Sequence, residues 1–213
     1  MLVSHTHKFI FIHMSKTAGT SIEETLLPLT NAIKGFDVRT ENLENRKNLS
    51  SRYLQKHCHL KDLRPFLGNE ICDSYFKFTF VRNPWDLHVA LYLYCNEMYQ
   101  IRKKEGIPDS DISEATLSAA KESFSNFVKT RFMYQNGIFS EDGSLNVDFV
   151  GKFENLYTDF EMVCKRIGLT ETPNLLHLHG TEKVDYRPYY NNETRDLVAH
   201  AESHLIKEFG YRF

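Results

Sequence analysis

The first organised pattern of apolar and polar positions lies near the start of the chain. Residues 8–14 form a short apolar run rich in Phe and Ile, which is typical of a strand buried on both faces. Residues 15–21 are small, hydroxylated or glycine, as in a turn. Residues 22–29 then place apolar side chains at helical spacing, and we expect Glu23 and Glu24 in the first turn, where acids complement the helix dipole. The pattern predicts a strand, a loop and a helix in succession.

Two later stretches repeat this order. Residues 75–81 alternate, with phenylalanines on one face, and predict a second strand. Pro84 is suited to the first turn of the helix that follows, which is apolar nearly all round until Asn96 and should be buried in its first half. Residues 147–153 read as a third strand and residues 154–169 as a helix. Strands that alternate with helices imply an α/β fold with a mainly parallel sheet covered on both faces.

Weaker patterns predict shorter elements between and after these units. They are a solvated connection at 30–56, a short helix crossed by Pro65, a loop with a helical stretch at 105–122, a helix at 123–134, a small hairpin around residues 138 and 139, and a last helix capped by Asn191 or Asn192. With 213 residues the chain is long enough for one ordinary core, so we expect a single domain over residues 1–213.

Charge and composition exclude several classes of partner. The chain has 26 Lys and Arg against 28 Asp and Glu, a net charge of −2, so it carries no bulk basic field for nucleic acid or a membrane surface. It has no run long enough to span a bilayer and no secretory signal pattern, from which we expect a cytoplasmic protein. The four cysteines are scattered, form no CxxC and are expected to be free thiols.

The loop after the first strand has the chemistry of an anion site. Backbone N–H groups at a helix start point outward, and the dipole there favours negative charge. Lys16 adds a cation, while Thr17, Thr20 and Ser21 add hydroxyl donors. The loop is not a Walker A sequence, because Lys16 precedes its single glycine, Gly19. A polar turn without a ligand is the alternative.

The second strand ends in a cation. P-loop nucleotidases place an Asp for Mg²⁺ at the end of a later strand, whereas this chain has Arg82. A guanidinium there favours direct recognition of an anion without a metal. The alternative is a structural pair with Asp86, four residues further on.

These residues carry a resemblance to a known family. Lys-Thr-Ala-Gly-Thr-Ser after the first strand, with Arg-Asn-Pro-Trp-Asp after a later one, resembles the sulfotransferases that use 3′-phosphoadenosine 5′-phosphosulfate (PAPS). The carbohydrate type is most similar, including the uronyl 2-O-sulfotransferases and their small bacterial relatives. The similarity extends to KFENLYTDFEMVCKRIGL, DYRPYY and the terminal FGYRF, so it covers nearly the whole chain. It implies a P-loop-like three-layer sandwich and a PAPS-dependent enzyme.

The resemblance assigns roles residue by residue. It places Lys16 on the 5′-phosphosulfate bridge and Arg82 on the 3′-phosphate. Lys183 and Arg187 lie where related enzymes close a loop over the nucleotide, so they are candidate phosphate contacts. The residues that would supply backbone N–H and hydroxyl contacts to the phosphosulfate are Thr17, Ala18, Gly19, Thr20 and Ser21.

Two histidines between the motifs are candidates for the general base. In the 2-O-sulfotransferases a His-x-His supplies the base, which points to His59 with His57 in support, and imidazole titrates near neutral pH. The alternatives are exposed loop histidines, or a zinc site with His5 and His7, whose spacing does not match the usual patterns. No metal is expected. His13 is expected to pack at the strand end.

Most aromatic residues near the motifs are expected to pack rather than to bind a ligand. Trp85 is expected in the core, and Tyr189 and Tyr190 are expected to pack the C-terminal loop down. Tyr186 has two open interpretations, since it could stack on the nucleotide or pack.

The sequence therefore predicts transfer of a sulfuryl group from PAPS to a hydroxyl of a sugar, glycan or small alcohol, with the 3′,5′-bisphosphate PAP as product. Ala90 and Leu87 stand where the family usually has a Ser and an Arg near the 3′-phosphate. They support one rival, a relative that binds a nucleotide or glycan without turnover. A P-loop-like small-molecule kinase is the other rival, and the missing strand-end Asp argues against it.

Overall fold

The computed structural model describes residues 1–34, 60–130, 135–178 and 185–213. The chain divides into two compact units. The first, here the sheet unit, comprises Met1–Arg82 and Gly137–Leu178. The second, here the helical unit, comprises Asn83–Asn136 and His179–Phe213. The polypeptide passes from one unit to the other after Arg82, Asn136 and Leu178.

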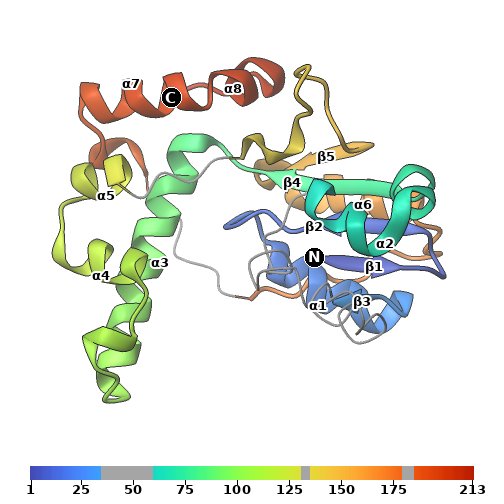
Figure 1. Ribbon diagram of the computed structural model, residues 1–213, viewed down its shortest axis with the longest axis horizontal. Helices are drawn as coiled ribbons and strands as arrows, with labels where there is room; N and C mark the ends of the chain where they lie inside the picture. Colours follow the sequence, from blue (N-terminus) through green and yellow to red (C-terminus); the bar gives the residue numbers. More distant parts are fainter. Residues whose placement is uncertain (35–59, 131–134, 179–184) are drawn as a thin grey trace. The chain divides into compact units, whose positions relative to one another are not determined.

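The sheet unit is built on one five-stranded sheet of order β3-β1-β2-β4-β5 (Figure 1). Strands β2, β4 and β5 run parallel, with Phe11 opposite Phe78 and Phe80 opposite Gly151. Strand β1 pairs antiparallel with both β2 and β3. The strands are β1 (Leu2–Ser4), β2 (Phe9–Ile12), β3 (Ile33–Lys34), β4 (Phe76–Val81) and β5 (Phe149–Lys152). The predicted α/β fold with a mainly parallel sheet is confirmed, and the sequence patterns missed β1 and β3.

Helices cover the sheet to give three layers. Helices α1 (Gly19–Thr30) and α6 (Leu156–Arg166) pack against the phenylalanines of β2 and β4. Helix α2 (Leu60–Ser74) lies in front of the sheet in Figure 1 and α6 behind it. The alternate residues of β2, Ile10 and Ile12, are also fully buried, so neither face of this strand meets solvent. The core cluster on the α1 and α6 face contains Leu2, Phe9, Phe11, Ile22, Leu26, Phe78, Phe80, Phe160, Val163, Cys164 and Ile167.

Three predicted details of the sheet unit can be compared with the structure. The short helix crossed by Pro65 continues past a kink at Gly68, whose φ of 80° an L-residue rarely adopts. The small hairpin is confirmed by an antiparallel bridge between Phe139 and Leu145. The helix predicted at 154–169 spans Leu156–Arg166, and Gly168 follows its C-cap with positive φ, as expected for a helix stop.

The helical unit contains the long helix α3 (Pro84–Lys104) and several shorter ones. Asn83 caps α3, because its side-chain oxygen accepts the N–H groups of Trp85 (3.0 Å) and Asp86 (3.3 Å), and Pro84 takes the first turn as predicted. The shorter elements are η4 (Asp109–Asp111), α4 (Glu114–Lys121), α5 (Phe124–Thr130), η7 (Arg187–Tyr189), α7 (Asn192–Ala201) and α8 (Ser203–Phe209), and η5 (Asn136–Ile138) carries the chain back to the sheet unit.

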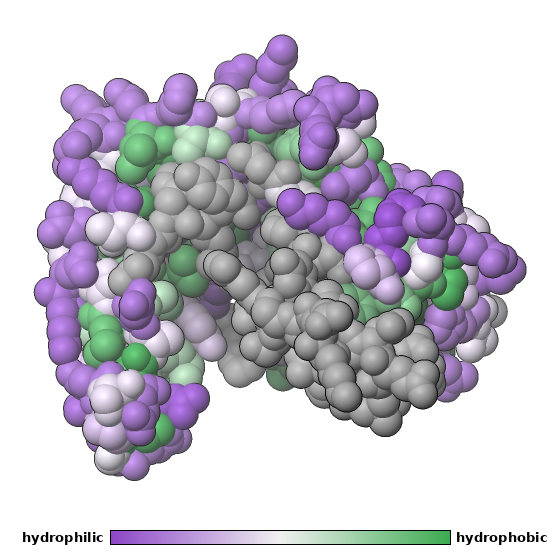
Figure 2. Space-filling view, in the orientation of Figure 1, coloured by the Kyte–Doolittle hydropathy of each residue, from purple (hydrophilic) through white to green (hydrophobic). Residues whose placement is uncertain are grey.

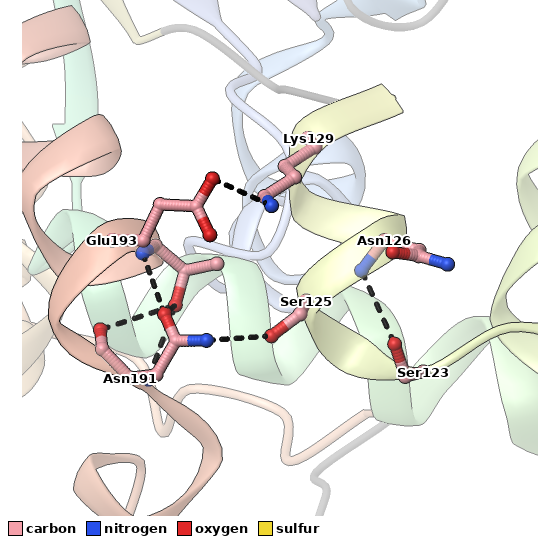
Figure 3. A network of polar contacts seen from close by, with 7 residues as sticks. Ser123, Ser125, Asn126, Lys129, Asn191 and Glu193 are labelled. Carbon is pink, nitrogen blue, oxygen red and sulfur yellow. Dashed lines mark hydrogen bonds and ion pairs between the residues drawn. The ribbon is translucent and has the colours of Figure 1, made fainter.

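One helix predicted at the end of the chain is in fact two. The backbone at Glu202 has φ −105° and ψ 20°, outside the helical range, and separates α7 from α8. The Asn191 side chain caps α7 through a capping box with Thr194 and also donates to Ser125 Oγ at 3.3 Å (Figure 3). Lys129 and Glu193 form an ion pair of 2.7 Å beside this bond, so polar contacts join α5 to α7.

The aromatic residues of the helical unit pack together, as expected for Trp85, Tyr189 and Tyr190. Trp85 is only 4% exposed, and both tyrosine rings meet the edge or face of Phe124 with centroids 5.6 and 4.9 Å apart. Tyr190 Oη donates to Trp85 O at 2.9 Å. The ring of Phe213 closes this cluster against Trp85, Tyr186 and Tyr190.

Three of the cysteines are buried free thiols, namely Cys72, Cys95 and Cys164, while Cys58 lies outside the described residues. Burial raises the pKa of the Cys164 thiol to about 11, so it stays protonated at neutral pH. Among the described helices none has the length and apolar character needed to cross a membrane. On the face drawn in Figure 2, exposed apolar side chains form separate areas among hydrophilic ones.

Candidate anion site at the strand ends

Three neighbouring parallel strands deliver chain segments to one edge of the sheet. Strand β2 leads into the loop before α1, β4 leads directly into Arg82, and β5 leads directly into Phe153. In an open α/β sheet the carboxyl ends of the strands are the usual position of a ligand site. All three segments belong to the sheet unit.

The loop after β2 has an unusual backbone. Lys16 and Ala18 both have positive φ, 59° and 63°, in the left-handed region that residues with a side chain seldom occupy. Thr17 is fully buried between them, and its hydroxyl donates to Met14 O at 2.9 Å. The Thr17 hydroxyl thus supports the loop itself, and a contact of Thr17 with an anion would come from its backbone N–H.

The loop feeds the N-terminus of α1 without a cap. Ala18 is the residue that precedes the helix, and its side chain makes no capping hydrogen bond. The first turn also lacks acidic residues. The expectation that Glu23 and Glu24 lie there is wrong, because α1 begins already at Gly19 and places both in its second turn. A helix start that carries no carboxylate keeps its favourable potential for an external anion.

Gly19 is required by its contact with His13. An added Cβ at Gly19 would lie 2.1 Å from His13 Cδ2, closer than carbon atoms approach. His13 itself is 3% exposed, and its Nδ1 lies 2.9 Å from Glu23 Oε1, an oxygen that the Met1 nitrogen also contacts. His13 therefore packs at the end of β2, as expected, and its ring supports the loop through the contact with Gly19.

Arg82 joins the second motif to the first. Its Nη1 donates to Lys16 O at 3.1 Å, and its guanidinium lies over the Phe153 ring, with Cζ 4.2 Å from the centroid. The side chain is half-buried. The two motifs, 66 residues apart in sequence, thus meet at one place.

Ser21 and Thr25 use their hydroxyls to hold a distant segment. Leu178 N donates to Ser21 Oγ at 3.2 Å, and Ser21 Oγ donates to Leu178 O at 3.4 Å. One helical turn later, Leu176 N donates to Thr25 Oγ1 at 3.0 Å. Residues 176–178 therefore run along α1 beside the loop, and the Ser21 hydroxyl is engaged in that contact.

Other candidate residues lie elsewhere. Arg187 belongs to the helical unit, where it pairs with Asp185 at 3.0 Å and lies 5.0 Å from the Tyr186 ring. Ala90 and Leu87 are buried in α3 of the same unit. The candidate base residues His57 and His59, and the candidate phosphate contact Lys183, lie outside the described residues.

The structure also bears on the zinc alternative. His5 Nδ1 lies 2.8 Å from Tyr75 Oη, and His7 Nδ1 lies 2.7 Å from Ile167 O, so each ring is held by a protein group. Within the described ranges, no group of three or more His, Cys, Asp or Glu side chains is arranged to hold a metal ion.

Phe153 is the residue at this edge that the sequence patterns did not single out. In the structure Phe153 directly follows β5 just as Arg82 directly follows β4, whereas the sequence patterns placed Phe153 inside the strand predicted at 147–153. Residues that follow neighbouring parallel strands are brought to one edge of the sheet, whatever their distance in sequence.

Comparison with known proteins shows the family of the chain. The sulfotransferase family model matches residues 1–207. The chain belongs to the sulfotransferase family. It is 31% identical over 115 residues to an uncharacterized protein of Archaeoglobus fulgidus, a match that covers 51% of this chain and 81% of that protein.

A second relative is carbohydrate sulfotransferase 14 of Danio rerio. Our chain is 23% identical to it over an alignment of 230 positions, a match that covers 98% of this chain but 58% of that protein. The chain thus spans less than two thirds of the Danio rerio protein's length. No solved structure matches. Family membership supports sulfuryl transfer as the general class of reaction.

Proposed function

We propose that this family member transfers the sulfuryl group of PAPS to a hydroxyl of a sugar, a glycan or a small alcohol and releases PAP. The observation that carries the proposal is the meeting of Lys16 and Arg82 at the uncapped start of α1. PAPS is anionic at both its phosphosulfate and its 3′-phosphate. A loop, a helix start and two cations at one sheet edge suit such a ligand.

The residues of the loop fit the phosphosulfate end of the donor. Lys16 would neutralise the bridge, and the backbone N–H groups of residues 17–20, with the Thr20 hydroxyl, would bind its oxygens. Ser21 would contribute through its backbone N–H, since its hydroxyl holds Leu178. Arg82 would bind the 3′-phosphate while it holds the loop, with Lys183 and Arg187 as further phosphate contacts.

The proposed reaction is an in-line displacement at sulfur. The acceptor hydroxyl would lose its proton to His59, supported by His57, as its oxygen bonds to sulfur. The bond from sulfur to the bridging oxygen breaks, and that oxygen leaves on PAP with a negative charge that Lys16 and the dipole of α1 stabilise. No metal is needed in this scheme, because cations of the protein balance the charge.

A carbohydrate acceptor is favoured by one comparison, since the Danio rerio relative is named a carbohydrate sulfotransferase. We further propose that the protein works in the cytoplasm, without nucleic acid or membrane partners.

Binding without turnover is the second candidate. Leu87 and Ala90 are 0% and 3% exposed, so each packs inside the helical unit and offers no polar group to a phosphate. The absence of polar groups at these two positions favours weak binding of the nucleotide's 3′-phosphate.

Thermal unfolding with PAP, in the absence of Mg²⁺, tests the proposal. A ligand that binds the folded state alone raises the melting temperature with its concentration. We expect PAP to stabilise the wild type, and Lys16→Ala and Arg82→Ala to abolish the effect. Lys165→Ala is the matched control, because Lys165 lies on the exposed face of α6 in an ion pair with Glu161.

Each other outcome is informative. Stabilisation by ATP with Mg²⁺ but not by PAP would replace the sulfotransferase with a kinase. PAP binding without transfer to any hydroxyl acceptor would establish the second candidate.

A further inference from the structure

We propose that Phe153 is a positioning residue of the anion site, one that holds the Arg82 guanidinium against the Lys16 loop. The inference rests on the proposed function, because it concerns the same site. Phe153 would touch neither donor nor acceptor and would act only through Arg82.

The geometry of the stack is the first argument. Arg82 Cζ lies 4.2 Å from the centroid of the Phe153 ring, well inside the range of about 6 Å for cation–π contacts. A guanidinium carries its five N–H donors in one plane. A ring at this distance limits how far the guanidinium can turn while Arg82 donates to Lys16 O.

The ring is itself held in place. Phe153 begins the short helix η6 (Phe153–Asn155), which lies between β5 and α6. Lys152 N donates to Asp159 Oδ2 at 2.6 Å, and this bond holds the end of β5 to the first turn of α6. Gly151 brings β5 close to β4, since an added Cβ there would lie 2.4 Å from the Phe80 ring. The position of Phe153 relative to the end of β4 is thus fixed by the sheet.

Two contacts connect the segments that follow three neighbouring strands. They run from Phe153 after β5, through Arg82 after β4, to the carbonyl of Lys16 after β2. Lys16 has positive φ, a conformation that needs support from its surroundings. Without the ring, Arg82 would gain rotamer freedom and would hold the loop less firmly.

The experiment compares Phe153→Leu with Phe153→Tyr, by calorimetric titration of PAP without Mg²⁺. Leucine keeps an apolar side chain but lacks the π-face, whereas tyrosine keeps it. We expect Phe153→Leu to weaken PAP binding by roughly tenfold and Phe153→Tyr by less than about threefold. Phe149→Leu, in β5 and partly buried against the core, controls for a general loss of packing.

A double-mutant cycle tests the route of action. In the Arg82→Lys background, Phe153→Leu should weaken PAP binding by less than about threefold. A lysine ammonium group is not planar and cannot stack on the Phe153 ring as a guanidinium does. An undiminished tenfold effect in that background would show that Phe153 acts independently of Arg82 and would overturn the inference.

Nuclear magnetic resonance separates this inference from the proposed function. Ring currents of Phe153 should shift the Arg82 Nε–H signal, and Phe153→Leu should remove that shift and move the amide signals of residues 16–19. If the wild type fails to bind PAP, the proposed function falls, yet these signals still test the positioning. If Phe153→Leu leaves them unchanged, or leaves PAP affinity unchanged, Phe153 is not a positioning residue.

Discussion

At Gly19 a hydrogen atom stands where any other residue would place a carbon against the His13 ring. His13 is fixed in turn by its 2.9 Å contact with Glu23, so the ring has little room to move away. The loop backbone between His13 and Gly19 contains both left-handed residues, Lys16 and Ala18. A shift of either end would therefore change the donors that the loop presents.

We expect Gly19→Ala to destabilise the protein by about 1–3 kcal/mol, as overpacked sites do, and to weaken PAP binding. Chemical denaturation and PAP titration measure the two effects. His13→Ala opens the space, so the same change in that background should be less destabilising. If Gly19→Ala costs the same free energy in both backgrounds, the clash with His13 is not its cause.

At the scale of elements, α1 both ends the loop and holds a distant segment of the chain. Its first turn ends the loop, while Ser21 and Thr25 form a row on one face that holds Leu178 and Leu176 by their backbone N–H groups. The sequence motif predicted that Ser21 contacts the phosphosulfate of PAPS. The structure adds a partner 157 residues away, which no local pattern could indicate.

Replacing both hydroxyls, by Ser21→Ala with Thr25→Val, should expose the amides of Leu176 and Leu178 to hydrogen exchange. Each lost hydrogen bond is expected to reduce the free energy of unfolding by about 1 kcal/mol. Exchange measured residue by residue gives the result, with Thr158→Val on the exposed side of α6 as control. Unchanged protection at both amides would mean that packing alone holds this segment.

At the scale of the whole molecule, the chain builds two units by passing between them three times. The first passage falls inside the Arg82-Asn83-Pro84 motif, so Arg82 directly follows β4 of the sheet unit while Asn83 caps α3 of the helical unit. One motif thus serves the sheet edge and the start of α3. The single domain expected over residues 1–213 from the length of the chain stays a prediction.

The stability of the molecule should depend on pH through Glu202. Its carboxyl is fully buried; Oε1 accepts the Gln135 N–H at 2.8 Å, and among the described residues Oε2 has no hydrogen-bond partner. Burial raises the pKa of Glu202 from 4.5 to about 7. Between these values the unfolded chain is ionised while the folded protein holds the proton, so the free energy of unfolding falls as pH rises.

The ionisation of Glu202 does not change the free energy of unfolding below pH 4.5. Above pH 7 it lowers that free energy by its full amount, about 3 kcal/mol. Glu202→Gln removes the titration, so the variant should gain stability relative to wild type as pH rises from 4.5 to 7. Denaturation at pH 5 and pH 8 measures the change, and Glu208→Gln on the exposed side of α8 is the control. An equal stability difference at both pH values would show that Glu202 does not titrate in this range.

The parts of the site that sequence could predict are those encoded locally. The strand, loop and helix around Lys16, the end of the second strand at Arg82 and the role of Pro84 all follow from periodicity and turn chemistry within a few residues. The three longer strands and their helices were recognised for the same reason. Strands β1 and β3 have three and two residues, too few to show a period, and depend on their neighbours.

By itself, then, the sequence determined the α/β alternation, the strand-loop-helix unit around Lys16 and the positions of Lys16 and Arg82 after two of the strands. The tertiary structure decided which groups meet: the Arg82 guanidinium with the Lys16 carbonyl and the Phe153 ring, and His13 with Gly19. The physical reason is that hydrophobic period and turn chemistry act over one or two turns of chain. Contacts at a sheet edge depend instead on strand order, which joins residues far apart in sequence.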